Sequence, residues 1–179
     1  MPVVAFLFAH DAAIFLALSV LVGVGLVLRG PRTRERVVDR LLVAFLLLSG
    51  SARFLVLFLQ DTLLPGLAGG AVEGAGAADA IARLALAELA IAALCLFALR
   101  PVVPVRIAVV TALAIVQLGA GIVWIVLALA GAEPGGWPRL DTVAAVLAGI
   151  YGLVLLAFDW ANRTDEPDPL TPGDQRLTY

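Results

Sequence analysis

Five long apolar stretches, separated by short charged or Gly/Pro-rich breaks, limit what this chain can fold into. Each stretch has roughly 20 residues, the length that a helix needs to cross the hydrocarbon core of a bilayer. Of the 179 residues, 62% are hydrophobic and 15% are charged, and the mean hydropathy is +1.04. A soluble domain of this size has too small an interior for so much apolar surface. The sequence therefore predicts an all-α, polytopic membrane helix bundle with five transmembrane helices.

The breaks between the apolar stretches set the predicted helix ends. Gly30-Pro31 ends the first helix because proline cannot continue the hydrogen-bond ladder. Residues 1–162 are expected to form one transmembrane bundle, and the polar, proline-rich residues 163–179 a disordered cytoplasmic tail. The predicted helices are Val3–Leu28, Leu41–Leu59, Ala77–Leu99, Val105–Ala130 and Leu140–Ala161.

Arginine placement predicts the orientation. The break between the first two helices carries five arginines, the connection before the fourth helix carries Arg100 and Arg106, and the tail carries Arg163 and Arg176. The two breaks on the opposite side carry Arg139 as their one basic residue. Loops rich in arginine stay in the cytoplasm. We therefore expect the amino terminus outside, the carboxy terminus in the cytoplasm, and a multi-pass location in the inner (plasma) membrane.

Charge and rare residues exclude several classes of function. The net charge is −2, which gives no support for nucleic-acid binding. The one cysteine, Cys95, rules out an internal disulfide or a cysteine metal cluster, and the one histidine, His10, rules out bis-histidine haem ligation within one chain. We expect no cofactor and no metal. The expected partners are membrane lipids, a second copy of the chain or another membrane protein.

Ionisable groups inside the predicted spans are the candidate functional residues, because each needs a partner or an aqueous cavity. At about 1.5 Å per residue, Arg53 and Arg83 lie roughly 10 Å from the outer helix ends, and Asp11 slightly deeper. Glu88 and Gln117 lie near the midplane on the same scale. Similar depths predict that Arg53 and Glu88 lie close together.

Two interpretations of these groups stay open. They either form ion pairs that fix helix register, or they line an outward-facing polar pocket. Arg53 follows the small residues Ser49-Gly50-Ser51-Ala52, and its guanidinium suits two-point capture of a carboxylate or phosphate. Arg83 either pairs with Asp79 one turn away or reaches outwards. His10, beside Asp11, is either an acid/base group or an interfacial polar group.

Small residues predict where helices approach closely. Ser19-x3-Gly23 and Ala145-x3-Gly149 are small-x3-small patterns, which serve contacts within one protein or between copies. Gln117 and Gly121 share one face of the fourth helix, which is expected to pack against a neighbour.

Part of the chain resembles the last three helices of bacterial prolipoprotein diacylglyceryl transferases. The resemblance spans about residues 10–101 and depends on His10, the arginine-rich turn, Gly50-Ser51-Ala52-Arg53-Phe54 and Ala98-Leu99-Arg100-Pro101. The family's His-Pro-x-Gln-Leu-Tyr-Glu motif is absent, Leu57 replaces its usual acidic residue, and its catalytic amino-terminal half has no counterpart. The resemblance implies a lipid-headgroup site near Arg53.

The sequence therefore favours a non-enzymatic membrane protein that binds or conducts a small ligand or lipid headgroup through an outward-facing site. Its expected ligand-binding residues are Arg53, Glu88, Asp11, Arg83, Gln117 and His10. One alternative is a lipid-modifying, transferase-like enzyme that uses Arg53, Glu88 and His10. Another is an accessory subunit that packs against a larger complex through its small-residue faces.

Overall fold

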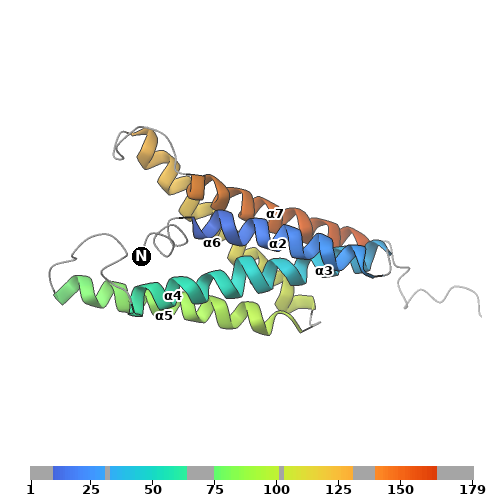
Figure 1. Cartoon of the computed structure of the whole chain (residues 1–179), viewed down its shortest axis with the longest axis horizontal. Helices are drawn as coiled ribbons and strands as arrows, with labels where there is room; N and C mark the ends of the chain where they lie inside the picture. Colours follow the sequence, from blue (N-terminus) through green and yellow to red (C-terminus); the bar gives the residue numbers. More distant parts are fainter. Residues whose placement is uncertain (1–9, 31–32, 64–74, 101–102, 131–139, 165–179) are drawn as a thin grey trace, which may run out of the picture.

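The computed structural model describes residues 10–30, 33–63, 75–100, 103–130 and 140–164, and these ranges are helical almost throughout (Figure 1). They contain no strand. Five helical rods are long and apolar enough to cross a membrane, which confirms the predicted number. The elements are α2 (Asp11–Leu28), α3 (Arg34–Phe45), the π-helix η1 (Leu46–Ala52), α4 (Arg53–Leu63), α5 (Ala75–Phe97), α6 (Val103–Leu129) and α7 (Leu140–Thr164).

The second rod is longer than predicted, and it is not one regular helix. It runs without a break through α3, η1 and α4, so Arg34–Arg40, which we expected in a loop, forms the first turns of α3. Arginine and glutamate are good helix formers, and Val38, Leu42 and Phe45 fall on one buried face at helical spacing. The charged start of α3 is therefore an amphipathic extension of the span.

The other predicted boundaries agree with the structure to within a few residues. The expected first turns from Val3 lie outside the described residues, as does the expected tail from residue 165 onward. Helix α7 continues to Thr164, so the predicted start of the tail at residue 163 is wrong by two residues.

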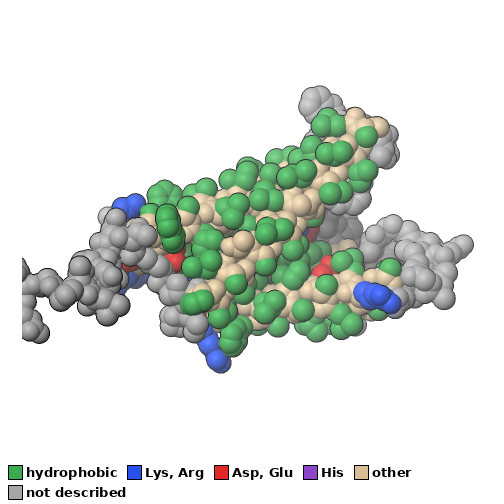
Figure 2. Space-filling view, turned by 180° about the vertical axis from the view of Figure 1, so that it is seen from behind, with side chains coloured by type: hydrophobic (Ala, Val, Ile, Leu, Met, Phe, Trp, Pro, Cys, Tyr) green, Lys and Arg blue, Asp and Glu red, His purple; other side chains and the backbone are tan. Residues whose placement is uncertain are grey.

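Apolar side chains are spread over the whole described part of the face seen in Figure 2. Exposed large hydrophobic residues occur on every rod, whereas several polar side chains are buried. This pattern suits a protein surrounded by lipid, where a polar group must find its partner inside the bundle. The buried polar residues are Asp11, Ser19, Ser49, Ser51, Glu88, Arg106, Gln117, Asp159 and Asn162.

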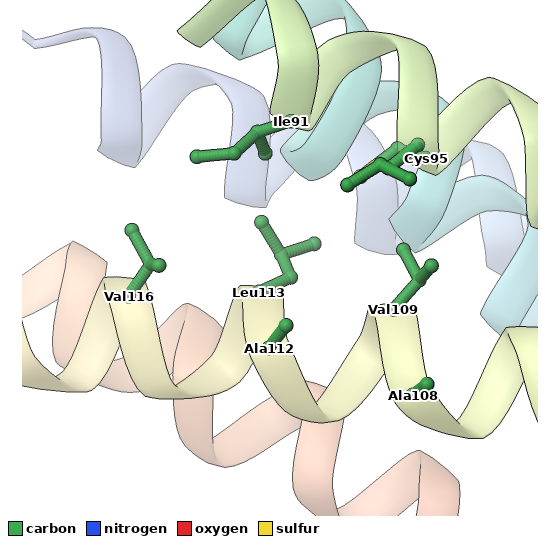
Figure 3. Close-up of a pocket in the computed structure, with 8 residues that line it drawn as sticks. Ile91, Cys95, Ala108, Val109, Ala112, Leu113 and Val116 are labelled. Carbon is green, nitrogen blue, oxygen red and sulfur yellow. The ribbon is translucent and has the colours of Figure 1, made fainter. Parts of the chain in front are cut away.

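The helices do not pack evenly around the bundle. Helix α6 packs along α7, and α5 packs against η1 and α4, but α5 and α6 make little direct contact. An apolar cavity of about 280 Å³ lies between α5 and α6 (Figure 3). The bundle is therefore loosest on the side where these two helices face each other.

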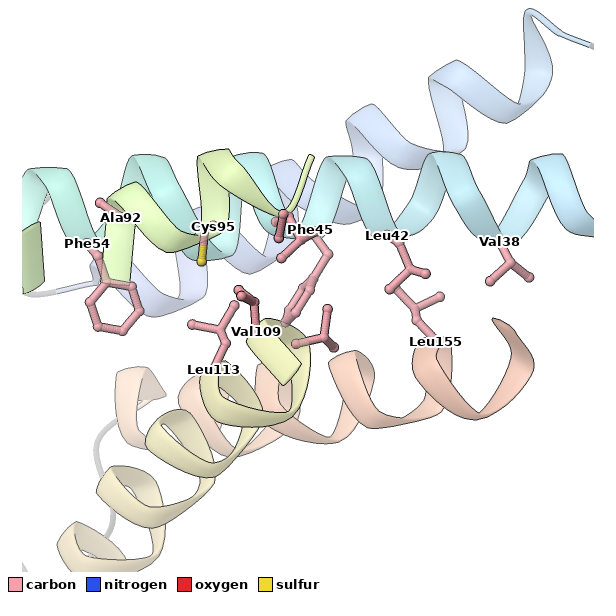
Figure 4. Packing of buried hydrophobic residues seen from close by; sticks show 12 residues of the cluster. Val38, Leu42, Phe45, Phe54, Ala92, Cys95, Val109, Leu113 and Leu155 are labelled. Atoms are coloured by element: carbon pink, nitrogen blue, oxygen red, sulfur yellow. The ribbon is translucent and has the colours of Figure 1, made fainter. Parts of the chain in front are cut away.

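The main core joins the second rod to α5, α6 and α7 (Figure 4). Phe45 is fully buried, and its ring meets that of Tyr151 edge-on at 5.7 Å. The small-residue patterns serve contacts within this bundle. A Cβ atom on Gly23 would lie 2.8 Å from the Leu41 side chain, and one on Gly149 would lie 3.0 Å from the backbone carbonyl oxygen of Ala114.

A second arginine is buried at the opposite end of the bundle from Arg53. The guanidinium of Arg106 pairs with Asp39, and its Nε donates to the carbonyl oxygen of Ala98 at 3.4 Å. Ala98 follows the last residue of α5, so Arg106 donates to a backbone carbonyl at a helix end, where such groups have no partner within the helix. The contact ties the beginnings of α3 and α6 to the end of α5.

Candidate functional site: a polar cavity inside the bundle

An ion pair joins Arg53 at the start of α4 to Asp11 at the start of α2. Arg53 Nε donates to Asp11 Oδ2 at 2.6 Å, and the side chains are 12% and 6% exposed. The sequence predicted that Arg53 and Glu88 lie close together, and both do line the cavity described below, where their charges interact. The direct salt bridge of Arg53, however, is to Asp11 on α2.

Asp11 lies in the first turn of α2, where a negative charge is favourable because the helix dipole is positive at that end. Asp141 reaches the same turn from α7, and its Oδ1 accepts the backbone N–H of Ala13 at 3.1 Å. Its carboxyl group also lies near that of Asp11. Asp141 therefore accepts a backbone hydrogen bond at the start of α2. Its place as the second residue of α7 did not indicate this contact.

The π segment η1 brings the second rod close to three other helices. The Ser49 hydroxyl donates to the Ser19 hydroxyl oxygen on α2 at 3.2 Å, and Gln117 on α6 donates from Nε2 to the Ser49 carbonyl oxygen at 3.1 Å. A Cβ atom on Gly50 would lie 2.6 Å from Cys95 Sγ on α5. Arg53 follows this segment directly, so the contacts of η1 fix the start of α4 and the position of its arginine.

A cavity of about 530 Å³ opens beside this arginine, and its walls come from α4, α5, α6 and α7. Arg53, Glu88 and Gln117 are its polar lining residues, and the other lining residues are apolar. The cavity combines a cation, an anion and an amide inside an apolar wall.

Two oxygen atoms on this wall have no hydrogen-bond partner among the described residues: Glu88 Oε2 and Gln117 Oε1. Both side chains are buried, with exposed fractions of 7% and 1%. A buried polar atom without a partner costs on the order of 1–3 kcal/mol, and more when it belongs to a charged group. Both oxygens accept hydrogen bonds, so a molecule that offers N–H or O–H groups would satisfy them.

The structure does not bring all the predicted residues to this wall. Asp11 is held by Arg53, and Glu88 and Gln117 line the cavity, whereas Arg83 is exposed on α5 and does not line it. His10 is half-buried at the N-cap position of α2, with its carbonyl oxygen accepting the N–H of Ile14 at 3.0 Å. Asp79, the predicted partner of Arg83, has a side chain outside the described part of the structure.

Among the described residues, no group of three or more His, Cys, Asp or Glu side chains is arranged to hold a metal ion. Searches against protein-family models, curated proteins and solved structures find no match for the chain. The resemblance to prolipoprotein diacylglyceryl transferases stays a prediction from short motifs.

Proposed function

We propose that this protein is an integral membrane protein that binds the polar headgroup of a lipid, or of a similar amphipathic molecule, in the cavity beside Arg53. The observation that carries the proposal is the pair of buried, unpartnered oxygens on its wall, Glu88 Oε2 and Gln117 Oε1. A bound headgroup with N–H groups would supply the donors that the described residues do not.

The charges on the wall favour a headgroup of mixed sign. Arg53 uses its Nε for Asp11 and also lines the cavity, and a guanidinium has further N–H groups that can donate to a phosphate. Glu88 attracts a cation, whereas a ligand that was only anionic would be repelled by the nearby carboxylates of Glu88 and Asp11. A phosphoethanolamine headgroup meets both demands because it joins a phosphate to a primary ammonium.

The proposed orientation places the arginine-rich end in the cytoplasm and the cavity toward the outer side of the inner membrane. Arg29, Arg34, Arg36, Arg40 and Arg100 support this orientation because they lie at the end where α2 and α5 finish and α3 begins. Binding is favoured over conduction. Toward the arginine-rich end, the cavity between α5 and α6 is lined only by apolar side chains among the described residues.

Lipid retention in Arg53→Lys and Glu88→Gln tests the headgroup proposal. Lysine keeps the charge but loses the planar fork of donors, and glutamine keeps the shape but loses the charge that attracts an ammonium. We expect each change to lower retention of phosphatidylethanolamine by roughly tenfold, the effect of losing one hydrogen bond to a charged group. Native mass spectrometry in mild detergent measures retention, and thermal melting checks the fold.

Two comparisons control this experiment. Arg83→Lys changes an exposed arginine that does not line the cavity, and it should leave retention unchanged. Phosphatidylcholine, whose quaternary ammonium has no N–H group, should be retained less than phosphatidylethanolamine by the parent protein. Full retention in a stable Arg53→Lys protein, together with equal retention of the two lipids, would contradict the proposal.

A further inference from the structure

The apolar cavity between α5 and α6 has no polar lining residue among those described. Ile91 and Cys95 on α5 face Val109, Leu113 and Val116 on α6 across the gap (Figure 3). An apolar cavity of roughly 150 Å³ is enough to bind benzene, and this one measures about 280 Å³. It therefore has room for a longer piece of hydrocarbon.

This apolar cavity continues the polar one. Ile91 and Val116 line both cavities, so the two meet between the middle of α5 and the middle of α6. On one side of this point, the polar cavity is lined by Arg53, Glu88 and Gln117. On the other side, the apolar cavity is lined by hydrocarbon side chains and the buried thiol of Cys95. A polar site and an apolar groove joined end to end match the two parts of a lipid molecule.

The length of the groove also fits. From Val116 to Ala108 the lining follows α6 for eight residues, or about 12 Å along the helix axis. Half of a hydrocarbon core that is about 30 Å thick measures about 15 Å, so the groove covers most of the depth of one leaflet. Hydrocarbon in the groove would make the dispersion contacts that its apolar lining lacks when empty.

We infer that the molecule bound by this protein is a lipid with an acyl chain, and that one chain lies in the groove between α5 and α6 while the headgroup occupies the polar cavity. The inference rests on the proposed function for the headgroup and adds the source of chain selectivity. The chain runs from Ile91 and Val116 toward Cys95 and Ala108, away from Arg53.

Filling the groove tests the inference without altering the polar residues. Ala112→Phe places a ring in the middle of the groove, and Ala108→Phe places one at its far end. Ala93→Phe is the matched control, because Ala93 is exposed on α5 and does not line either cavity. The probes are phosphatidylethanolamines that share one headgroup and carry acyl chains of 6, 10, 14 or 18 carbons, a series of roughly graded length chosen to span one leaflet.

We expect the delipidated parent and Ala93→Phe to retain the longer chains several-fold better than the shortest. Ala112→Phe should abolish this preference while the shortest lipid still binds, and Ala108→Phe should shift it to intermediate lengths. An unchanged long-chain preference in a stably folded Ala112→Phe protein would overturn the inference, as would a parent that binds all four lengths equally.

The same data separate this inference from the proposed function. A parent that retains none of the four lipids contradicts the headgroup proposal and the inference with it, whereas equal binding of all lengths contradicts the inference alone. If a second copy of the chain fills the groove, Ala112→Phe would shift the protein from dimer to monomer in size-exclusion chromatography with light scattering, and that outcome would also overturn the inference.

Discussion

At the scale of single residues, the ion pair of Asp11 and Arg53 joins the start of α2 to the start of α4. Both side chains are largely buried, and one charge of each sign faces the other at 2.6 Å. Removing two charges from water is costly, so such a pair often fixes an arrangement more than it adds net stability. Whether or not the intact pair adds net stability, loss of one partner lowers the stability of the fold, because the other is left as an uncompensated charge among apolar groups.

Asp11→Asn should therefore destabilise the protein by about 3–5 kcal/mol, the usual cost of breaking a buried pair on one side. Arg53→Gln should cost a similar amount, and the double substitution should cost less than the sum of the two. The free energy of unfolding in a titration with SDS measures all three. Glu35→Gln, on the exposed first turn of α3, serves as the control. Strictly additive losses would mean that the two residues do not interact.

Depth along a helix could be predicted from the sequence, but direction around the helix could not. Counting residues placed Asp11, Arg53, Glu88 and Gln117 at similar levels, and the structure brings three of them to one cavity wall and the fourth into contact with Arg53. Arg53 forms its salt bridge with Asp11 and not with Glu88 because of how the helices are arranged around α4. The spacing of residues along one sequence does not reveal which helices are neighbours.

At the scale of elements, η1 is the feature that the sequence pattern did not reveal. A π segment shifts the faces of the helix that follows it, and such segments often occur at functional sites. Ser49 and Gly50 lie within it, and they contact α2, α6 and α5. Small residues precede Arg53 in the sequence, and in the structure Gly50 among them lies directly against Cys95.

Gly50→Ala tests this close approach. The added Cβ would lie 2.6 Å from Cys95 Sγ and 3.1 Å from its Cβ, so α5 or η1 must shift. We expect a loss of about 1–3 kcal/mol in the free energy of unfolding, as for other overpacked sites, with partial recovery when Cys95→Ala removes the sulfur. Gly119→Ala meets no atom within 4 Å and should be harmless. Equal effects of the two glycine substitutions would contradict the packing seen at η1.

Helix number and approximate bounds could be predicted because apolar length and Gly/Pro breaks are local properties. The start of α3 was missed for the opposite reason. Its arginines have a low hydropathy, and they extend the rod only because Val38 and Leu42 find a buried face against the rest of the bundle. A hydropathy pattern detects the membrane-crossing part of a helix and overlooks an amphipathic extension outside it.

At the scale of the whole molecule, packing is tight on one side and loose on the other. Small residues let α2 approach α3 and let α7 approach α6, so both small-x3-small patterns are used inside the chain. This use weakens the alternative of an accessory subunit that meets its partner through those faces. The loosely packed side, between α5 and α6, holds both cavities. Binding at this side needs no disruption of the core.

The distribution of arginines along the bundle predicts its orientation in the membrane. The rod from Arg34 to Leu63 crosses the bundle, with the exposed residues Glu35 near one end and Thr62 near the other. Arginines gather at the Glu35 end, and cytoplasmic retention of basic segments predicts that this end lies inside the cell. In a Cys95→Ala background, Thr62→Cys should react with a membrane-impermeant maleimide in intact cells. Glu35→Cys should react only after the membrane is permeabilised.

The Cys95→Ala protein without a new cysteine controls for background labelling, since Cys95 is fully buried and is the one native thiol. Labelling of Glu35→Cys in intact cells, with protection of Thr62→Cys, would reverse the orientation. The Arg53 cavity would then lie toward the cytoplasm, and the headgroup that it binds would come from the inner leaflet. The contacts that define the cavity would be unchanged, because they depend on the bundle and not on the side from which a lipid enters.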